Sequence, residues 1–212
     1  IAMTFKQFSS DQNVIDFVQT HTAVFNNSHT ISVTEIGDGN INFIYRVSDG
    51  DNSLIVKQAL PYIRVIGEAW PLSQDRIRIE AKALRQSAEV CPGCVPEVYH
   101  YDAIRCAIIM EDIGRWQNLR QALIERQPLP GIAAALGNFL ARSFFYSSVF
   151  YLNSGAQKTQ VQAFINPDLC SISEEVYFWD PFCDHERNNV NPLLAARAVS
   201  WWQDDDLKQA VA

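Results

Sequence analysis

The feature that most restricts the fold is a period-two alternation of apolar and polar residues between positions 31 and 60. Because successive side chains of a β-strand point to opposite faces of a sheet, this alternation predicts three strands, at residues 31–37, 41–48 and 53–60. Clusters of Gly, Asp and Asn separate them, at Gly37 to Asn40 and at Asp49 to Asn52. Such residues are typical of tight turns, so we expect the strands to form an antiparallel meander.

The first turn contains two glycines, Gly37 and Gly39, which raises the question of phosphate binding. The phosphate loops of α/β proteins need a helix directly after the glycines, because its N-terminus holds the phosphate. Here a strand follows, which leaves the glycine-rich hairpin of protein kinases as the remaining arrangement. That pattern, G-x-G-x-x-G, would place glycine where this chain has Asn42. An ordinary turn and a phosphate-covering turn therefore both remain open.

A helix is predicted over residues 73–89, with Ser73 as its N-cap. Its apolar stripe consists of Ile77, Ala81, Leu84 and Ala88. Glu80 falls in the middle of this stripe. A carboxylate on the face directed toward the core is costly unless it finds a cation, so Glu80 requires a partner.

Lys57 is a matching exception in the third strand, where it lies on the same face as Ile55. If the helix packs against the sheet, Lys57 and Glu80 meet between them and each satisfies the other's charge. One alternative is that Lys57 reaches solvent through its long stem. The other is that Glu80 pairs with Arg76 or Lys82.

The remaining pattern predicts two more strands, at residues 95–102 and 105–112, and helices at residues 10–26, 116–125 and 131–152. The last of these is the longest apolar stretch, and we expect a buried core helix. Asn138 and Arg142 inside it make a bilayer span unfavourable.

The predicted fold class is therefore α+β. A five-stranded antiparallel lobe with one packed helix is followed by a linker and the start of a helical lobe. The corresponding boundaries are residues 1–110, 111–115 and 116–212.

Composition argues against several classes of function. The formal net charge is −7 and there is no run of Lys or Arg, which disfavours nucleic-acid binding. The sequence shows no signal-peptide pattern, and its five Cys, an odd number, favour reduced thiols and a cytoplasmic location. Cys91 and Cys94 have metal-like spacing, but a turn at the Pro-Gly between them is the simpler interpretation. Four scattered His predict no metal site.

Several segments together resemble the 5-methylthioribose kinase family of the methionine salvage pathway. They are GDGNINFIYRV, IVKQALPYIRVIGEAWPLSQDRIRIEA, MEDI and PFCDHERN, and the likeness runs from about residue 4 onward. The resemblance implies a protein-kinase-like fold related to aminoglycoside and choline kinases. It also implies transfer of the γ-phosphoryl group of ATP to the 1-hydroxyl of S-methyl-5-thioribose, with Mg²⁺ as cofactor.

The resemblance assigns roles to residues already singled out. The turn Gly37, Asp38, Gly39 and Asn40 would cover the triphosphate, with Asn40 as the direct contact. Lys57 would bind α- and β-phosphate oxygens and would be oriented by Glu80. The hinge residues Glu111, Asp112 and Ile113 would face the adenine, through the Glu111 carbonyl and the Ile113 amide.

One departure from the family pattern concerns catalysis. The resemblance implies a catalytic Asp in an HGD loop and a later DxE pair for Mg²⁺, and this chain has no HGD followed by DxE. We therefore expect an N-terminal portion of the enzyme, inactive alone, with no catalytic residue and no metal ligand in this chain. Asp184 and Asn189 have the D-x-x-x-x-N spacing of a kinase catalytic loop, but a structural role with Glu186 and Arg187 in ion pairs is favoured.

Two alternatives remain from the sequence. The chain could belong to a choline- or aminoglycoside-type kinase, or it could be a non-catalytic nucleotide-binding module. The family resemblance also implies a homodimer, whereas neither a nucleic acid nor a membrane is an expected partner.

Overall fold

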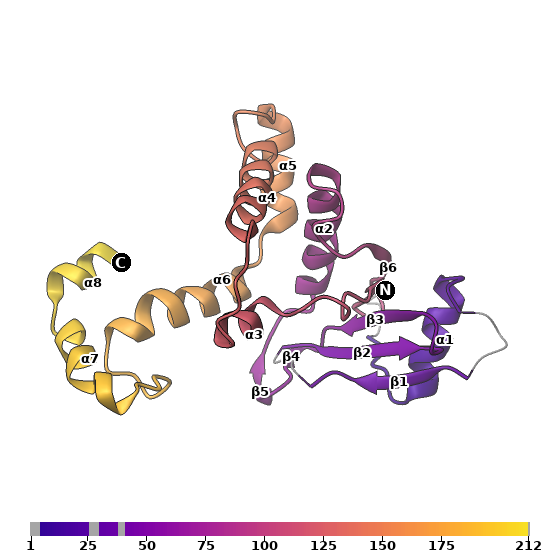
Figure 1. Ribbon diagram of the computed structural model, residues 1–212, viewed down its shortest axis with the longest axis horizontal. Helices are drawn as coiled ribbons and strands as arrows, with labels where there is room; N and C mark the ends of the chain where they lie inside the picture. The colour runs from indigo at the N-terminus through magenta and orange to yellow at the C-terminus, as the bar shows by residue number, and fades with distance from the viewer. Residues whose placement is uncertain (1–4, 26–29, 38–40, 212) are drawn as a thin grey trace. The chain divides into compact units, whose positions relative to one another are not determined.

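The computed structural model describes residues 5–25, 30–37 and 41–211. The chain divides into two compact units, Ile1–Ile165 and Asn166–Ala212. Among the described residues, the first unit contains two sheets and five α-helices, and the second contains only helical elements (Figure 1). Among the described helices, none has both the length and the apolar character needed to cross a bilayer.

A five-stranded antiparallel sheet forms the centre of the first unit, in the order β1-β2-β3-β7-β6. Its strands are β1 Ser32–Glu35, β2 Phe43–Ser48, β3 Ser53–Gln58, β6 Val98–Asp102 and β7 Ala107–Glu111. The meander of β1, β2 and β3 and the predicted α+β class are confirmed. Each strand is shorter than its predicted range, because the turn residues at its ends take part in loops rather than in the ladder.

The turn between β2 and β3 shows how local chemistry sets the register. The Asp49 carboxylate accepts hydrogen bonds from the N–H groups of Asp51 and Asn52, at 3.1 and 2.7 Å. Gly50 has φ +95°, a conformation that favours glycine. The turn therefore places Ser48 opposite Ser53, and Ile44 comes to lie opposite Lys57.

A second, two-stranded sheet was not predicted. It consists of β4 Tyr62–Ile63 and β5 Gly67–Pro71. A strand of two residues is too short to show a period, so the alternation could not indicate it. The Leu72 N–H donates to the Pro61 carbonyl at 3.0 Å and closes the base of this hairpin just before the next helix.

Helix α1 Asp11–His21 covers one face of the sheet. Ser10 caps it by accepting a hydrogen bond from the Asn13 N–H. Its buried residues Val14, Phe17 and Val18 share a core cluster with residues of β2, β3 and β7. The helix predicted at residues 10–26 is confirmed, but it ends earlier, at His21.

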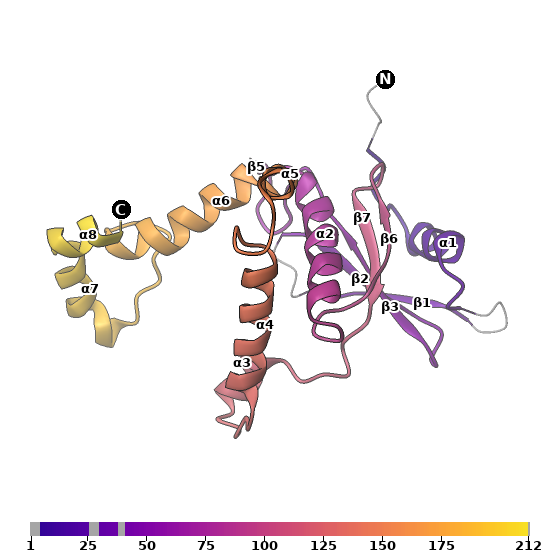
Figure 2. The same cartoon turned by 90° about the horizontal axis from the view of Figure 1, so that it is seen from above.

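Helix α2 Asp75–Val90 covers the opposite face (Figure 2). Ile77 and Ala81 pack against Ala59 and Ile108 in a second core cluster. The predicted N-cap is displaced by one position: the helix is preceded by Gln74, and Ser73 Oγ accepts from the Asp75 N–H at 3.2 Å without taking the cap position. Gln74 instead donates to the Ala59 carbonyl at 2.8 Å, which ties the start of the helix to the sheet.

The helices after the sheet are short. Those of the first unit are α3 Leu119–Ile124, α4 Ile132–Tyr146 and α5 Ser154–Phe164. Those of the second unit are α6 Pro167–Glu174, a π-helical turn Glu175–Trp179, 3-10 turns at Asp180–Phe182 and Pro192–Leu194, α7 Ala195–Trp202 and α8 Asp205–Val211.

The prediction of a buried core helix at residues 131–152 is wrong. Helix α4 has no buried residue, and Leu136, Phe144 and Phe145 are 45%, 68% and 50% exposed. An apolar composition predicts burial only where a second surface is available to cover the helix. The described residues supply such a surface for only part of α4.

Gln58, fully buried at the end of β3, generates a stability prediction. Its Oε1 accepts from the Phe8 N–H at 3.0 Å, and its Nε2 donates to the carbonyls of Lys6 and Arg105 at 3.1 and 2.8 Å. Gln58→Leu should lower the free energy of unfolding by about 2–4 kcal/mol, because it leaves these groups without a partner. Urea denaturation followed by circular dichroism measures the change.

The matched control is Gln12→Ala, in which an exposed amide that donates to Asp16 is removed. Its effect should stay within about 0.5 kcal/mol. Equal effects of the two substitutions would contradict the role given to Gln58.

Candidate functional site

The candidate site is built on a charge pair between β3 and α2. Lys57 Nζ donates to Glu80 Oε1 at 2.6 Å, and the two side chains are 23% and 29% exposed. The predicted contact is therefore confirmed. The alternative partners of Glu80 are engaged elsewhere: Arg76 bonds to Asn42, and the Lys82 ammonium lies over the ring of Phe164.

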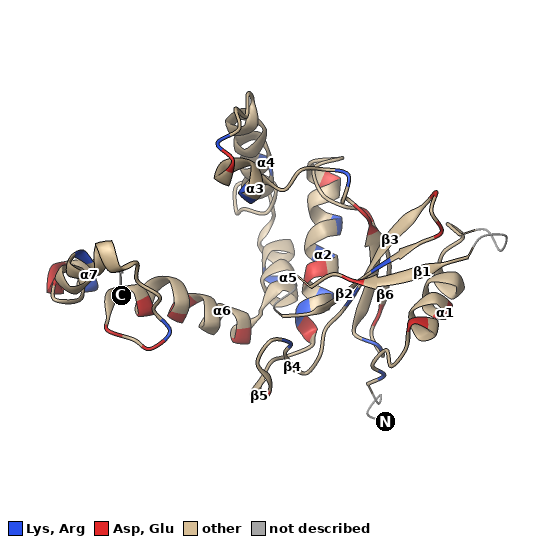
Figure 3. Cartoon of the chain, turned by 60° about the horizontal axis from the view of Figure 1, so that its bottom comes forward, with Lys and Arg blue, Asp and Glu red and all other residues tan. Residues whose placement is uncertain are grey.

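The surrounding packing places these two groups together. Lys57 lies in the middle of the sheet, opposite Ile44 on one side and Ile108 on the other. Ile77 and Ala81 are buried against the same sheet face, and they bring the turn of α2 that carries Glu80 over the strand. Basic and acidic residues alternate along this helix (Figure 3).

The pair is suited to binding an anion rather than to holding the fold together. A partly exposed ion pair contributes only about 0–1 kcal/mol to stability. An ammonium has three N–H donors, and Glu80 takes one of them. Donors therefore remain for phosphate or carboxylate oxygens.

The turn between β1 and β2 leads into Phe43, which lies opposite Gln58, the residue after Lys57. The Ile36 N–H donates to the Ile44 carbonyl at 2.8 Å, just before this turn. A Cβ at Gly37 would meet no heavy atom within 4 Å, so packing does not require glycine there. Asp38, Gly39 and Asn40, the other predicted phosphate-covering residues, lie outside the described residues.

Asn42 and Arg76 form a buried polar contact that the sequence did not reveal. Arg76 Nε donates to Asn42 Oδ1 at 2.8 Å, and the two residues are 4% and 6% exposed. Arg76 also donates to the Ser73 carbonyl at 2.7 Å, so the start of α2 is tied to the start of β2. Burial lowers the pKa of Arg76 to about 10, although Cys106 and Glu80 act in the opposite direction. Asn42 departs from the kinase glycine pattern, and here it has a structural use.

A second arginine ties the β4–β5 hairpin to β1 and β2. Arg64 forms an ion pair with Glu35, and its guanidinium lies 5.0 Å from the centre of the Phe43 ring. The Arg64 N–H also donates to the Ile41 carbonyl at 3.3 Å. The two arginines thus fix the residues on both sides of the turn.

The predicted hinge follows the last residue of β7. Glu111 lies opposite Leu54 of β3, three residues from Lys57 along that strand, which corresponds to about 10 Å. Asp112 binds Arg46 through hydrogen bonds of 2.6 and 3.3 Å to its two carboxylate oxygens. Ile113 is 45% exposed. The Asp112 side chain is thus engaged within the protein, so a ligand could use the backbone of this segment.

Gly114 follows the predicted hinge residues and lies close to the Asp112 and Arg46 side chains. Its N–H donates to Asp112 Oδ1 at 2.8 Å. A Cβ on this residue would lie 2.9 Å from that oxygen and would collide with the Arg46 guanidinium. A larger residue here would therefore displace the Arg46 guanidinium from its contact with Asp112.

The segment around Asp184 belongs to the second unit and has a structural arrangement. Arg187 binds Asp180 at 2.7 Å and Glu175 at 3.1 Å, and this confirms the predicted ion pairing of Arg187. The prediction is wrong for Glu186, which is exposed and forms no ion pair with any described residue. Asp184 is exposed as well. Asp184 and Glu186 themselves have the D-x-E spacing, but no HGD motif precedes them in this chain.

No protein-family model matches the chain. A methylthioribose kinase from Yersinia pseudotuberculosis serotype O:1b (strain IP 31758) is 40% identical to it over 202 residues, which cover 94% of this chain and 50% of that relative. A methylthioribose kinase from Yersinia enterocolitica is 42% identical over 184 residues, 86% of this chain and 46% of the relative. One from Enterobacter sp. (strain 638) is 39% identical over 203 residues, 95% and 51% respectively.

The predicted resemblance is thereby confirmed for nearly all of the chain. The chain spans about half the length of the curated relatives it matches.

Asp112 generates a prediction about pH. Burial raises its pKa, but hydrogen bonds from Arg46, the Gly114 N–H and Ser53 outweigh burial, and the net effect lowers the pKa below the ordinary value of 3.8. As the pH falls, the Asp112 carboxylate is therefore protonated in the unfolded chain at a higher pH than in the folded chain. The stabilisation by Asp112 is complete above the unfolded-state pKa and is lost as the pH falls through the folded-state pKa.

Asp112→Asn should consequently lower the free energy of unfolding near neutral pH, because the ion pair with Arg46 is lost. The loss should be only about 1 kcal/mol, because Arg46 is partly exposed and solvent screens the pair. The difference from the wild type should vanish in acid. Urea titrations from about pH 7 to about pH 3 measure it. Glu68→Gln, which changes an exposed carboxylate of β5, should show no such convergence. A constant difference across the pH range for Asp112→Asn would contradict the prediction.

Proposed function

We propose that this chain forms the ATP-binding part of a kinase that phosphorylates S-methyl-5-thioribose on its 1-hydroxyl. The observation that carries the proposal is the 2.6 Å contact between Lys57 and Glu80. It occurs in a chain about 40% identical to methylthioribose kinases. In protein kinases a lysine of the third strand and a glutamate of the following helix form such a pair, which must be in place for phosphoryl transfer.

In this proposal Lys57 binds oxygens of the α- and β-phosphates, and Glu80 orients its ammonium. Because a phosphoryl group transfers through a loose transition state with spread negative charge, the enzyme acts mainly by positioning and by neutralising charge. A lysine held by one carboxylate keeps its charge and its remaining donors directed at one place. The Lys57–Glu80 pair would supply this fixed positive charge.

We assign the nucleotide's other contacts to the two ends of the site. The turn from Gly37 to Asn40 covers the triphosphate, where glycine lets the backbone come close to an anion. The hinge from Glu111 to Ile113 binds the adenine edge through backbone groups. The Asp112 carboxylate holds the hinge in place through Arg46.

Mg²⁺ would neutralise phosphate charge when bound. We propose that the catalytic base and the Mg²⁺ ligands are residues that this chain does not contain, and that the reaction takes place in the cytoplasm in a homodimer. The boundaries 1–110, 111–115 and 116–212 remain our division into a nucleotide-binding lobe, a hinge and part of a second lobe.

Nucleotide binding by the 212-residue chain tests the role of Lys57. Lys57→Met and Glu80→Gln should each weaken binding of Mg-ATP, the first by about 10–100-fold, because a charge-assisted contact of about 1.5–3 kcal/mol is lost. Isothermal titration calorimetry measures the dissociation constants. Lys158→Met, which removes an exposed lysine of α5, should leave them unchanged. Equal binding by Lys57→Met and the wild type would refute the assignment of the site.

Phosphate transfer tests the substrate and the division of labour along the chain. Incubated with Mg-ATP and methylthioribose, choline or an aminoglycoside, the chain alone should form no phosphorylated product, because it lacks the HGD motif of such kinases. A full-length relative assayed alongside should phosphorylate methylthioribose only. Product formation by the chain alone that is lost in Asp184→Asn would give Asp184 a catalytic role.

A further inference from the structure

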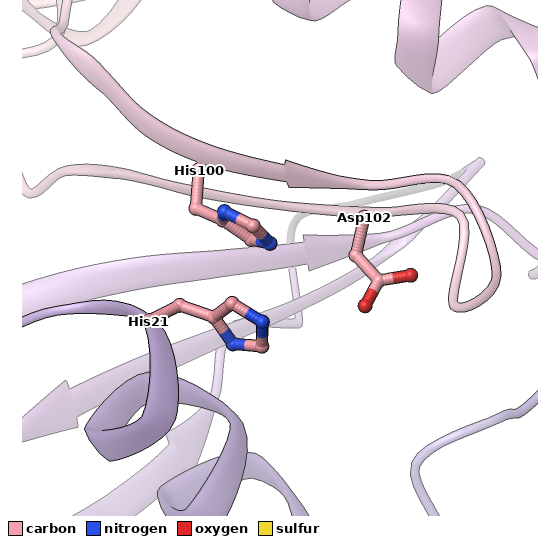
Figure 4. Close-up of side chains that lie close together, drawn as sticks. All are labelled: His21, His100 and Asp102. Carbon is pink, nitrogen blue, oxygen red and sulfur yellow. The ribbon is translucent and has the colours of Figure 1, made fainter.

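Three side chains that can bind a metal lie together on the sheet face away from Lys57. His21 is the last residue of α1, while His100 and Asp102 belong to β6. The two β6 residues are two positions apart, so they point to the same face of the sheet. Figure 4 shows a nitrogen of each ring and an oxygen of the carboxylate directed toward the space between the three residues.

The distances are close to those of a coordination site. One ligand atom from each residue lies within 4.8 Å of the others. The two imidazole rings are stacked, with centroids 3.9 Å apart and planes inclined by 27°. A tetrahedral ion bound at about 2.0–2.1 Å needs ligand atoms about 3.3 Å apart. Binding an ion would therefore require rotations of the side chains that bring the three ligand atoms closer together.

One ring nitrogen of His21 forms the kind of hydrogen bond that is common in histidine ligands of metals. Its Nδ1 lies 2.8 Å from the Phe17 carbonyl, to which it can only donate. The proton is thereby placed on Nδ1, and Nε2 keeps its lone pair for an ion. Histidine ligands of metals usually donate their other N–H to such a carbonyl, which fixes the tautomer and the orientation of the ring.

Asp102 is oriented in a comparable manner. Its Oδ1 accepts hydrogen bonds from the N–H groups of Ile104 and Arg105, at 2.7 and 2.8 Å. These bonds hold the carboxylate at the end of β6 and leave Oδ2 to coordinate. Carboxylates that bind metals typically accept hydrogen bonds of this kind from the surrounding protein.

His100 completes the set as a ring without a polar partner. It is half-buried, and within the described part of the chain neither of its nitrogens has a hydrogen-bond partner. A ring nitrogen of a neutral imidazole without a polar partner keeps its lone pair available to a metal.

We propose that His21, His100 and Asp102 bind one Zn²⁺ ion, with a water molecule as the fourth ligand. Two imidazoles and one carboxylate are a zinc ligand set, whereas Mg²⁺ and Ca²⁺ prefer sites made only of oxygen atoms. The ion would join the end of α1 to β6 and so stabilise the first unit. The scattered histidines had predicted no metal site, because 79 residues separate His21 from His100 and only the fold brings them together.

Metal titration of the 212-residue chain tests this proposal. We expect one Zn²⁺ per chain by calorimetry and a rise in melting temperature on adding Zn²⁺. Co²⁺ should give the visible absorption of a four-coordinate nitrogen and oxygen site, without the near-ultraviolet band of a cobalt–thiolate bond. That band would instead identify Cys91 and Cys94, whose sulfur atoms lie 2.8 Å apart, as the binding site and would overturn the proposal.

Substitutions locate the ion. His21→Gln, His100→Gln and Asp102→Asn should each weaken Zn²⁺ binding by more than the roughly 10–100-fold lost when a group that only orients a ligand is removed. Asp102→Asn keeps the oxygen that accepts from Ile104 and Arg105, and His21 is exposed, so at least these two variants should fold. His185→Gln and the double variant Cys91→Ser with Cys94→Ser are the controls and should bind as the wild type does. Binding that survives His21→Gln and Asp102→Asn, or no stoichiometric binding by the wild type, would refute the site.

Discussion

The packing of α2 against the centre of the sheet is the interaction on which the candidate site depends. Ile77 and Ala81 are buried against Ala59, directly after β3, and Ile108 of β7. The helical turn between them therefore holds Glu80 over Lys57. Burying one isoleucine contributes about 1.5–3 kcal/mol, more than the 0–1 kcal/mol of a partly exposed ion pair. The apolar contacts therefore position the charges, and the charges are left to act on a ligand.

Hydrogen-bonded polar side chains fix the irregular segments around this packed centre. Arg76 and Asn42 join the start of α2 to the start of β2, and Arg46 and Asp112 hold the segment after β7. These segments have few ladder hydrogen bonds of their own, and side-chain donors and acceptors take their place. The same regions contain the backbone groups to which we assign nucleotide contacts.

The sequence predicted the sheet and the Lys57–Glu80 contact for different physical reasons. Alternation with period two is a local property, so it indicated the five strands without knowledge of the fold. The ion pair was predictable because each charge violated an apolar pattern and required the other. The Asn42–Arg76 contact violated no pattern, and the β4–β5 hairpin was too short to form one. The exposure of α4 could not be predicted, because it depends on which other elements cover the helix, and the apolar composition of a helix does not show that.

Gln58 has a practical consequence for work with shorter versions of this chain. Its amide joins the backbone of Lys6 and Phe8 to the turn before β7, and the Phe8 ring belongs to the core under α1. The residues just before α1 are therefore hydrogen-bonded to the sheet and are needed to satisfy the Gln58 amide. Shortened versions for expression or crystallisation should begin before Lys6. Removing all residues up to α1 would take the Phe8 ring out of the core and leave the buried Gln58 amide without two of its partners.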